Sequence, residues 1–501
     1  MADEKKTSEQ TGEEEEKEPW MDRFLKSVSS YIPAIEKPTY KASFNTRLMW
    51  TGIALLLYLV LSNITVYGVA KSNYDRFRFF EIVLGSRFGS LMTLGIGPIV
   101  TAGILLQLLV GSKILDWDMN EPEVRSKFQT WNKLLAIILS FIEAAAYILA
   151  GAIPVTGGSY MTLAVILQLA AGGILVILLD DLVSKWGFGS GISLFIAVGV
   201  ANQILIRILS PFTVSCLPGN ISSCLPSVGN PPTGLLWVFI GYMLGGSPFA
   251  ALVTMLPVIA TVIVFLIVVF IQGIAIDIPL AFSAMRGFGR TWSLKLLYTS
   301  NIPVILTAAL VANLQLFGQI GIAPSTSGIR CGVLGCFDSN NQPVCTNFPN
   351  CGVIFYLSSP NNLLGDIFTG SVVPSEALRS ITYFLFYVIL STVFSIFWVN
   401  TSGMDSESVA NQISGIGMHI PGYRSDEKSM KQVLDKYIPN LAVIGGFLIG
   451  VIAALANFTG ALGTGTGILL AVMIIYNYYE ELSNQDLEGA NPIVKRFLGE
   501  Q

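Results

Sequence analysis

Ten long apolar runs, separated by mostly short polar loops, constrain this chain more than any other feature. Crossing the hydrocarbon core of a bilayer takes roughly 20 apolar residues, and a helix satisfies its backbone hydrogen bonds internally while doing so. Charged residues make up 12% of the sequence, about half the roughly 25% of soluble domains. We therefore predict an all-α polytopic membrane protein with ten transmembrane helices, at Leu48–Val69, Leu91–Leu109, Leu134–Ile153, Met161–Leu179, Phe188–Ile206, Ala250–Ile274, Asn301–Gly321, Ile381–Trp398, Leu441–Leu455 and Leu462–Tyr476.

The distribution of positive charge predicts the orientation of these spans. An even number of spans places both termini on the same side, and cytoplasmic loops carry an excess of Lys and Arg. With the N-terminus inside, 22 of the 29 Lys and Arg residues fall in cytoplasmic segments. All 6 cysteines then lie in external loops, where disulfides persist. We expect both termini to be cytoplasmic.

The cysteines form two groups, one in the loop after the fifth span and one in the loop after the seventh. Their even number favours disulfides over free thiols. Proximity in sequence favours a bond between Cys216 and Cys224. The sequence does not assign partners to the other four, which are Cys331, Cys336, Cys345 and Cys351.

Similar motifs recur at spans five apart. Gly189-Ser-Gly-Ile-Ser opens the fifth span and Gly465-Thr-Gly-Ile-Leu the tenth, while Gly-Pro-Ile-Val and Ile-Pro-Val-Ile lie in the second and seventh. Because five is odd, the second half enters the membrane with opposite polarity, and such inverted repeats place a pathway between the halves. We divide the chain into an acidic disordered tail (1–19), an N-terminal half opening with an interfacial helix (20–210), an external loop with the interfacial segment Leu235–Leu244 (211–249), a C-terminal half with a long external loop at 323–378 (250–480) and a cytoplasmic tail (481–501).

The interrupted spans carry branched aliphatic side chains at helical spacing. Taken singly, each is a lipid-facing or core residue. Taken together, they predict a ring that holds neither water nor ions well and that accepts a passing object of variable chemistry. The residues of this ring are Ile96, Val100, Ile192, Ile196, Ile302, Ile305 and Leu470.

Polar residues deep in the spans are few. Glu143 lies midway along the third span, Asn313 in the seventh and Thr101 in the second. A buried carboxylate needs a donor, so we expect these three to form a polar cluster. The cluster is either a fixed structural contact or a seam that opens between helices. The segment Asn73–Ser86 is too short to span and either folds back into an external cavity or forms a surface loop.

Catalysis and metal binding have little support in the sequence. There is 1 histidine, His419, and we find neither a phosphate-binding loop nor a nucleophile motif. We expect no enzyme activity, no catalytic residues, no metal and no cofactor. The alternative function is a secondary transporter with a five-plus-five inverted repeat, although the scarcity of acids at the midplane argues against it.

Four motifs resemble those of the SecY family, the large channel subunit of the protein-secretion translocon. They are Leu94-Gly-Ile-Gly-Pro-Ile-Val-Thr-Ala-Gly103, Gly187-Phe-Gly-Ser-Gly-Ile-Ser-Leu-Phe-Ile196, Tyr298-Thr-Ser-Asn-Ile-Pro-Val-Ile-Leu306 and Gly463-Thr-Gly-Thr-Gly-Ile-Leu-Leu-Ala-Val472. The likeness covers about residues 20 to 480 and is greatest to the archaeal and eukaryotic branch. It implies two halves that open like a clamshell, in a channel that passes unfolded secretory proteins and releases transmembrane helices sideways into lipid.

The resemblance also implies roles for particular residues. The ring matches the family's pore ring, and Thr101, Glu143 and Asn313 match the polar cluster of its lateral gate. Arg286, Arg290 and Arg424 match positions in loops that dock the ribosome. The implied partners are SecE-like (gamma) and beta single-span subunits, a ribosome or other driving partner, signal-bearing nascent chains and the lipids of the cell membrane. The segment that matches the plug, a short helix sealing the external funnel, contains Asp75, Phe79, Phe80, Ile82, Val83 and Leu84.

Overall fold

The computed structural model describes most of the chain between residues 35 and 483. Within that range it leaves out residues 41, 70–88, 113, 116, 118, 120, 150–152, 214–231, 283–288, 319–328, 339–341, 347–350, 361–362, 364–366, 368–369, 371–372, 416, 422–426 and 463. Every structural statement below concerns the described residues.

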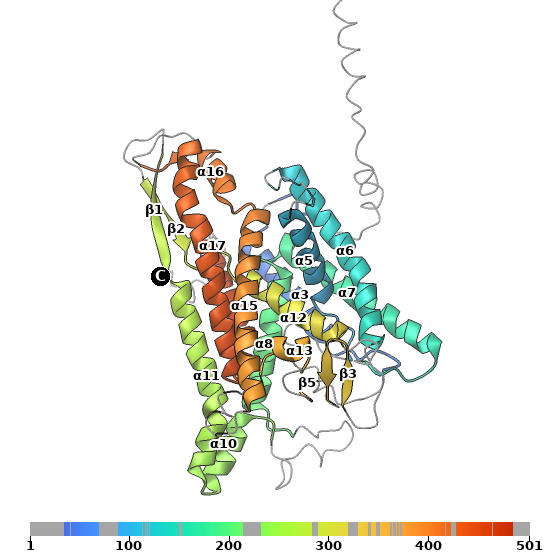
Figure 1. Ribbon diagram of the computed structural model, residues 1–501. Helices are drawn as coiled ribbons and strands as arrows, with labels where there is room; N and C mark the ends of the chain where they lie inside the picture. Colours follow the sequence, from blue (N-terminus) through green and yellow to red (C-terminus); the bar gives the residue numbers. More distant parts are fainter. Residues whose placement is uncertain are drawn as a thin grey trace, which may run out of the picture.

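A helix lies at each of the ten predicted spans, and these helices form an elongated bundle (Figure 1). Among the described residues, seven are long and apolar enough to cross a membrane; α5 and α12 are shorter apolar helices, and α18 ends in polar residues. The protein is therefore a mostly helical, multi-pass membrane protein. The helices are α3 (Phe44–Leu61), α5 (Gly97–Gly111), α6 (Pro122–Leu149), α7 (Ser159–Trp186), α8 (Gly191–Leu209), α11 (Pro248–Gln272), α12 (Ile302–Phe317), α15 (Pro374–Thr401), α17 (Glu427–Phe458) and α18 (Gly465–Ser483).

At the second span the helix begins at Gly97 rather than at the predicted Leu91. Residues 91–96 form successive turns, and Gly95 has a positive φ of 50°. A side chain at Gly172 of α7 would place its Cβ 1.8 Å from the carbonyl oxygen of Leu91. The glycines therefore let this segment turn and approach α7 closely.

Small residues also hold the second half together. Ser391 of α15 donates a hydrogen bond to the carbonyl oxygen of Gly446 on α17 (3.1 Å), and Ser395 donates one to that of Ala442 (2.6 Å). A Cβ at Gly450 would lie 3.0 Å from the Cα of Val388. Small residues spaced four apart let membrane helices approach closely and bond across the contact, as α15 and α17 do here.

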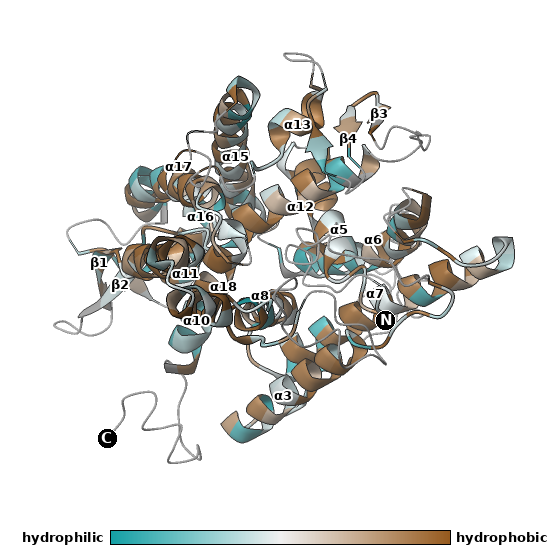
Figure 2. Cartoon of the chain, turned by 90° about the horizontal axis from the view of Figure 1, so that it is seen from below, coloured by the Kyte–Doolittle hydropathy of each residue, from teal (hydrophilic) through white to brown (hydrophobic). Residues whose placement is uncertain are grey.

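The apolar side chains that do not pack inside lie on the outside of the bundle. On α11, Phe249, Leu252 and Phe270 are 60% or more exposed. Figure 2 shows α3 at the edge of the bundle, and Leu56 on that helix is also exposed. An exposed apolar surface of this extent suits a protein surrounded by lipid.

The loops between the spans add two small β-sheets to the helical bundle. Strands β1 (Ala275–Phe282), β2 (Gly289–Lys295) and β6 (Met418–His419) form an antiparallel sheet in the order β2-β1-β6. A second antiparallel sheet contains β3 (Arg330–Gly332), β4 (Gly335–Phe337) and β5 (Pro343–Val344). The loop between α11 and α12 pairs β1 with β2 and is joined by β6 from the segment between α16 and α17, whereas β3, β4 and β5 pair within one loop. The two sheets lie toward opposite ends of the bundle (Figure 1).

The described parts of the loops also contain three short helices, α10 (Leu235–Leu244), α13 (Val353–Leu357) and α16 (Ser406–Gly415). The bounds of α10 equal those of the predicted interfacial segment. No side chain of α10 is buried, and Leu244 is 85% exposed. A ten-residue helix is too short to cross a bilayer, which agrees with an interfacial position.

Candidate functional site

The predicted ring residues lie in one apolar core where the two halves meet. Ile96 precedes α5, which carries Val100; Ile196 lies on α8, Ile305 on α12 and Leu470 on α18, and all five are buried. Ile192 and Ile302 are half-buried and pack against the same core. Four segments from both halves thus meet through branched aliphatic side chains. Apolar contacts of this kind exclude water and ions from the centre of the bundle.

Asp180 fixes the start of α8 and thereby the position of Ile192. The Asp180 carboxylate, near the end of α7, accepts a hydrogen bond from the backbone N–H of Ile192 at 2.9 Å. The first backbone N–H groups of a helix have no partner within the helix, so a carboxylate there stabilises the helix start. Gly189 turns the chain between the two helices with a positive φ of 61°.

The neighbouring Asp181 links α6 to α7. Its carboxylate pairs with Lys133 of α6 at 2.6 Å and with Lys185 of α7 at 2.8 Å. It also accepts a hydrogen bond from the backbone N–H of Ile35 at 2.9 Å. The side chain is 8% exposed, so the two lysines supply the opposite charge that a buried carboxylate needs.

A chain of hydrogen bonds joins three helices at the polar positions picked from the sequence. Thr101 of α5 donates to the carboxylate of Glu143 on α6 (2.8 Å), and the side-chain amide of Asn313 on α12 donates to the Thr101 hydroxyl (3.0 Å). Glu143 is buried, with 2% of its surface exposed. The chain crosses from the N-terminal half to the C-terminal half through Asn313. We call these polar contacts of Glu143, Thr101 and Asn313, which lie beside the apolar core, the seam.

Sequence reasoning missed a second buried polar cluster. Asn457, at the end of α17, donates to the hydroxyl of Tyr383 on α15 (2.6 Å) and to Thr466 on α18 (2.7 Å). The backbone N–H of Thr466 in turn donates to the Asn457 side chain (3.1 Å). The cluster fixes the start of α18, four residues before Leu470. The sequence feature that could have revealed this cluster is the position of Asn457, an isolated polar residue near the end of an apolar run.

Two disulfides lie in the loop between α12 and α15. They join Cys331 to Cys336 and Cys345 to Cys351, partners that the sequence left open. Cys331 lies opposite Cys336 in the β3–β4 register. The favoured pair, Cys216 and Cys224, lies outside the described residues.

Other predicted positions also lie outside the described part of the chain. These are the whole proposed plug, the interfacial segment near Trp20, Arg286 and Arg424. Of Arg290 only the backbone is described; it lies in β2, opposite Leu280 of β1. His419 lies in β6, and among the described residues no cluster of acidic, His or Cys side chains suits a metal.

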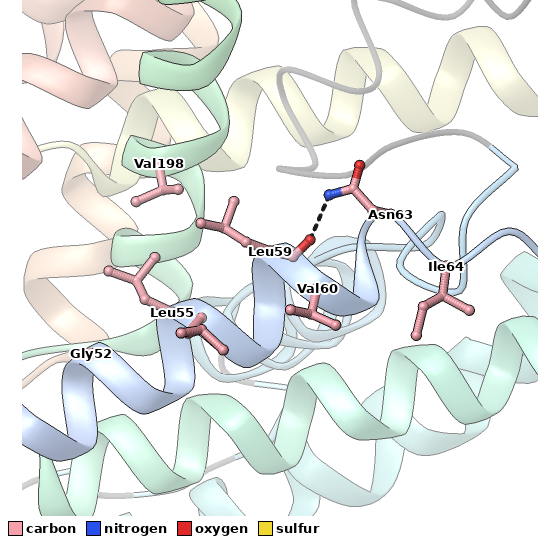
Figure 3. Close-up of a pocket in the computed structure, with 8 residues that line it drawn as sticks. Gly52, Leu55, Leu59, Val60, Asn63, Ile64 and Val198 are labelled. Atoms are coloured by element: carbon pink, nitrogen blue, oxygen red, sulfur yellow. Dashed lines mark hydrogen bonds between the residues drawn. The ribbon is translucent and has the colours of Figure 1, made fainter. Parts of the chain in front are cut away.

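An apolar groove lies on the outside of the bundle between α3 and α8 (Figure 3). Its volume is about 820 Å³. Asn63, the only amide side chain in its wall, donates a hydrogen bond to the Leu59 carbonyl at 2.7 Å. The groove is lined by Gly52, Leu55, Leu56, Leu59, Val60, Asn63, Ile64 and Val198.

Two helical halves that meet at an apolar centre, with a polar seam beside it, define a channel-type membrane protein. Comparison with known proteins identifies the type of channel. The SecY family model matches residues 90–479, and the model for the plug domain of Sec61p matches residues 56–89. The chain belongs to the SecY family, and its likeness is to the archaeal branch.

The individual similarities cover nearly the whole chain. The chain is 40% identical to the protein translocase subunit SecY of Pyrococcus furiosus, over 94% of this chain and 98% of that protein. A solved protein-conducting channel superposes with a TM-score of 0.73 at 38% identity, covering 91% of this chain and 96% of the other. Sec61 in a canine ribosome–channel complex from the endoplasmic reticulum superposes with a TM-score of 0.71 at the same identity and the same coverage.

These similarities establish the general function of the chain. It is the protein-conducting channel subunit of a translocase and includes a plug domain. It is a transport protein rather than an enzyme. The alternative of a secondary transporter is therefore set aside.

Proposed function

We propose that this channel passes unfolded secretory chains through the ring and releases hydrophobic helices sideways into lipid. The lateral exit runs between α5 and α6 on one side and α12 and α15 on the other. The observation that carries this proposal is the hydrogen-bond chain from Glu143 through Thr101 to Asn313. The bond from Asn313 to Thr101 joins the two sides directly, so opening the exit requires breaking it.

The apolar ring fits the axial part of the pathway. A translocating chain presents every kind of side chain, and aliphatic contacts accept them without demanding hydrogen-bond partners. Ile305 and Asn313 share α12, so a movement of this helix changes the ring and the seam together. The segment between α3 and α5, with Asp75 and Phe79, serves as the plug on the external side of the ring.

The groove between α3 and α8 supports a single-span companion as a partner. It is apolar, it faces outward, and its lining extends from Gly52 on α3 to Ile64, just after the end of that helix. A partner helix in this groove, of the SecE-like (gamma) type, would bury Leu56 and Val60 without crossing the lateral exit. We assign the second, beta-type subunit to the periphery of the complex.

Basic residues of the sequence between α11 and α12 and between α16 and α17, including Arg286, Arg290 and Arg424, fit docking of a ribosome or another driving partner. A ribosome presents phosphate-rich RNA, which positively charged loops attract. The solved relative in the canine complex binds a ribosome. The positive-inside distribution supports a position in the cell membrane with both termini cytoplasmic.

The test of this proposal is a photo-crosslinker at Ile305 in the channel complex, programmed with a stalled, signal-bearing nascent chain. We expect crosslinks that require a functional signal sequence, because Ile305 is buried at the ring in the state described here. The matched control is a crosslinker at Ile259 on α11, which is 50% exposed on the outside of the bundle and should stay silent. Signal-independent crosslinks, or none from Ile305, Ile192 and Val100 in a translocation-competent preparation, would exclude this ring as the pathway.

A further inference from the structure

The long external loop between α12 and α15 contains a compact folded unit. We call this unit the cap; it comprises the described residues of 330–358, with β3, β4, β5 and α13. Phe337, Cys351, Ile354 and Phe355 are buried, with 1–2% of their surface exposed. The backbone N–H of Ile354 donates to the carbonyl oxygen of Leu334 at 3.1 Å, which joins α13 to the turn between β3 and β4.

Arg379 attaches the cap to α15. Its guanidinium donates to the carbonyl oxygens of Ser358 (3.0 Å) and Ser359 (2.7 Å) and to the Ser358 hydroxyl (2.9 Å). It also pairs with Glu376 at 3.2 Å and lies over the ring of Phe355, 4.7 Å from its centre. The Arg379 side chain is 6% exposed. A buried guanidinium this fully bonded holds its partners in one geometry.

The cap also contacts the end of α12. A Cβ added at Gly318, directly after α12, would lie 2.0 Å from the Cδ1 atom of Ile354. Ile354 therefore packs closely against Gly318, and a side chain at that position would have to displace the end of the Ile354 side chain. On the other side of α13, the Tyr356 carbonyl accepts a hydrogen bond from Thr382 of α15 at 3.0 Å. One short helix thus contacts both α12 and α15.

The two disulfides differ in what they hold. Cys331–Cys336 closes the β3–β4 hairpin, which is already paired through its backbone. Cys345–Cys351 ends one residue before Gly352, the residue that caps the start of α13. A unit this small has little core of its own, and disulfides are the usual substitute. Only the Cys345–Cys351 bond constrains α13 directly.

We infer that the cap fastens α12 to α15, with Arg379 as the positioning residue, so that the two helices move as one side of the lateral exit. This inference rests on the proposed exit between α5 and α12. With the cap in place, opening separates α12 from α5 and leaves the distance between α12 and α15 unchanged. The cap thereby directs the movement to the seam that contains Asn313.

Distances between spin labels on the complete channel complex test the inference. Labels carried by non-natural amino acids, which spare the cysteines, replace Leu105 on α5, Phe317 on α12 and Ile381 on α15; all three side chains are exposed. The α5–α12 and α12–α15 distances are measured with and without a stalled, signal-bearing nascent chain. In the native protein we expect the first distance to grow and the second to stay narrow and unchanged.

The variants separate fastening from general stability. Arg379→Gln and the double variant Cys345→Ser/Cys351→Ser should broaden the α12–α15 distance distribution. Each lost hydrogen bond to the guanidinium shifts the attached-to-detached ratio by about tenfold. Compared with Arg379→Gln, Arg379→Lys should restore part of the narrow α12–α15 distribution. The ammonium keeps the positive charge, but it cannot reproduce the forked set of donors of the guanidinium. Cys331→Ser/Cys336→Ser is the matched control and should leave the distribution narrow.

The possible outcomes divide clearly. A narrow α12–α15 distribution in Arg379→Gln, with the nascent chain still widening α5–α12, overturns the fastening role and keeps the lateral exit. No change of the α5–α12 distance in the native protein overturns the exit itself. Should the Cys345/Cys351 variant fail to assemble, Arg379→Gln and Arg379→Lys give the decision alone.

Discussion

Removing the Asn313 side chain tests the energetics of the seam most directly. In the closed arrangement Asn313 donates to the Thr101 hydroxyl at 3.0 Å, across the boundary between the halves. A neutral hydrogen bond contributes a net of about 1 kcal/mol, and leaving the Thr101 hydroxyl oxygen without this donor adds little. Asn313→Ala should therefore lower the stability of the closed arrangement by about 1 kcal/mol, which is a shift of about fivefold toward the open one.

The assay is the open probability of single channels, with the purified complex reconstituted in a planar bilayer. Asn440→Ala is the matched control, because Asn440 is exposed and donates only to the Lys436 carbonyl of its own helix. We expect an increase of about fivefold for Asn313→Ala and none for Asn440→Ala. Thr101→Val should also give an increase of about fivefold, because it removes the same bond between the two sides; its other bond, to Glu143, joins α5 to α6 on one side of the exit and does not oppose opening.

The order of these effects matters more than their size. Equal open probabilities in Asn313→Ala, Asn440→Ala and the native protein would show that the bond does not hold the exit closed. The seam would then be a fixed structural contact, the alternative that the sequence left open. A lower open probability in Asn313→Ala would contradict the reasoning outright.

Two further predictions concern stability. Gly172→Ala should destabilise the protein by about 1–3 kcal/mol, since its Cβ would overlap the Leu91 carbonyl. Gly241→Ala, inside α10 and with open space around it, should be neutral or stabilising. Thermal unfolding in detergent compares the two variants, and equal midpoints would contradict the close approach of Leu91 to α7. Burial, aided by the charge of Asp405, raises the pKa of Tyr298 to about 12 from 10.0. The folded state therefore keeps this proton more tightly than the unfolded state, so stability should hold below pH 10 and fall between pH 10 and about 12. Tyr298→Phe should remove that part of the pH dependence, and an unchanged profile would refute it.

The sequence predicted the membrane helices and the site better than the loops, and the reason is physical. In lipid a backbone has few options, so apolar runs such as Ala250–Ile274 become helices almost by necessity. The polar residues inside those runs have equally few options, which is why Thr101, Glu143 and Asn313 could be grouped before any geometry was known. Their hydrogen bonds follow from the cost of leaving them unpaired.

The loops carry no such constraint. The sequence around Ala275–Lys295 has the alternation of a strand in only part of its length. It therefore does not distinguish a paired hairpin from an open loop. The pairing of Cys345 with Cys351 depends on how β5 and α13 pack, which is a tertiary property. Arg379 drew no attention because a lone arginine beside a predicted span looks like a solvated helix end, whereas here it is buried against the cap.

The strengths of the contacts at the seam fit the proposed release of helices into lipid. In the described part of the proposed exit, the hydrogen bond from Asn313 and the apolar contacts beside it join the two sides, and the bond contributes only about 1 kcal/mol. A hydrophobic signal helix that buries a few leucine side chains gains about 1.5–3 kcal/mol for each. Binding of such a helix therefore offsets the opening of the seam, whereas a polar segment does not. A seam held by several buried ion pairs would lack this discrimination, because the cost of opening would exceed what an ordinary signal helix supplies.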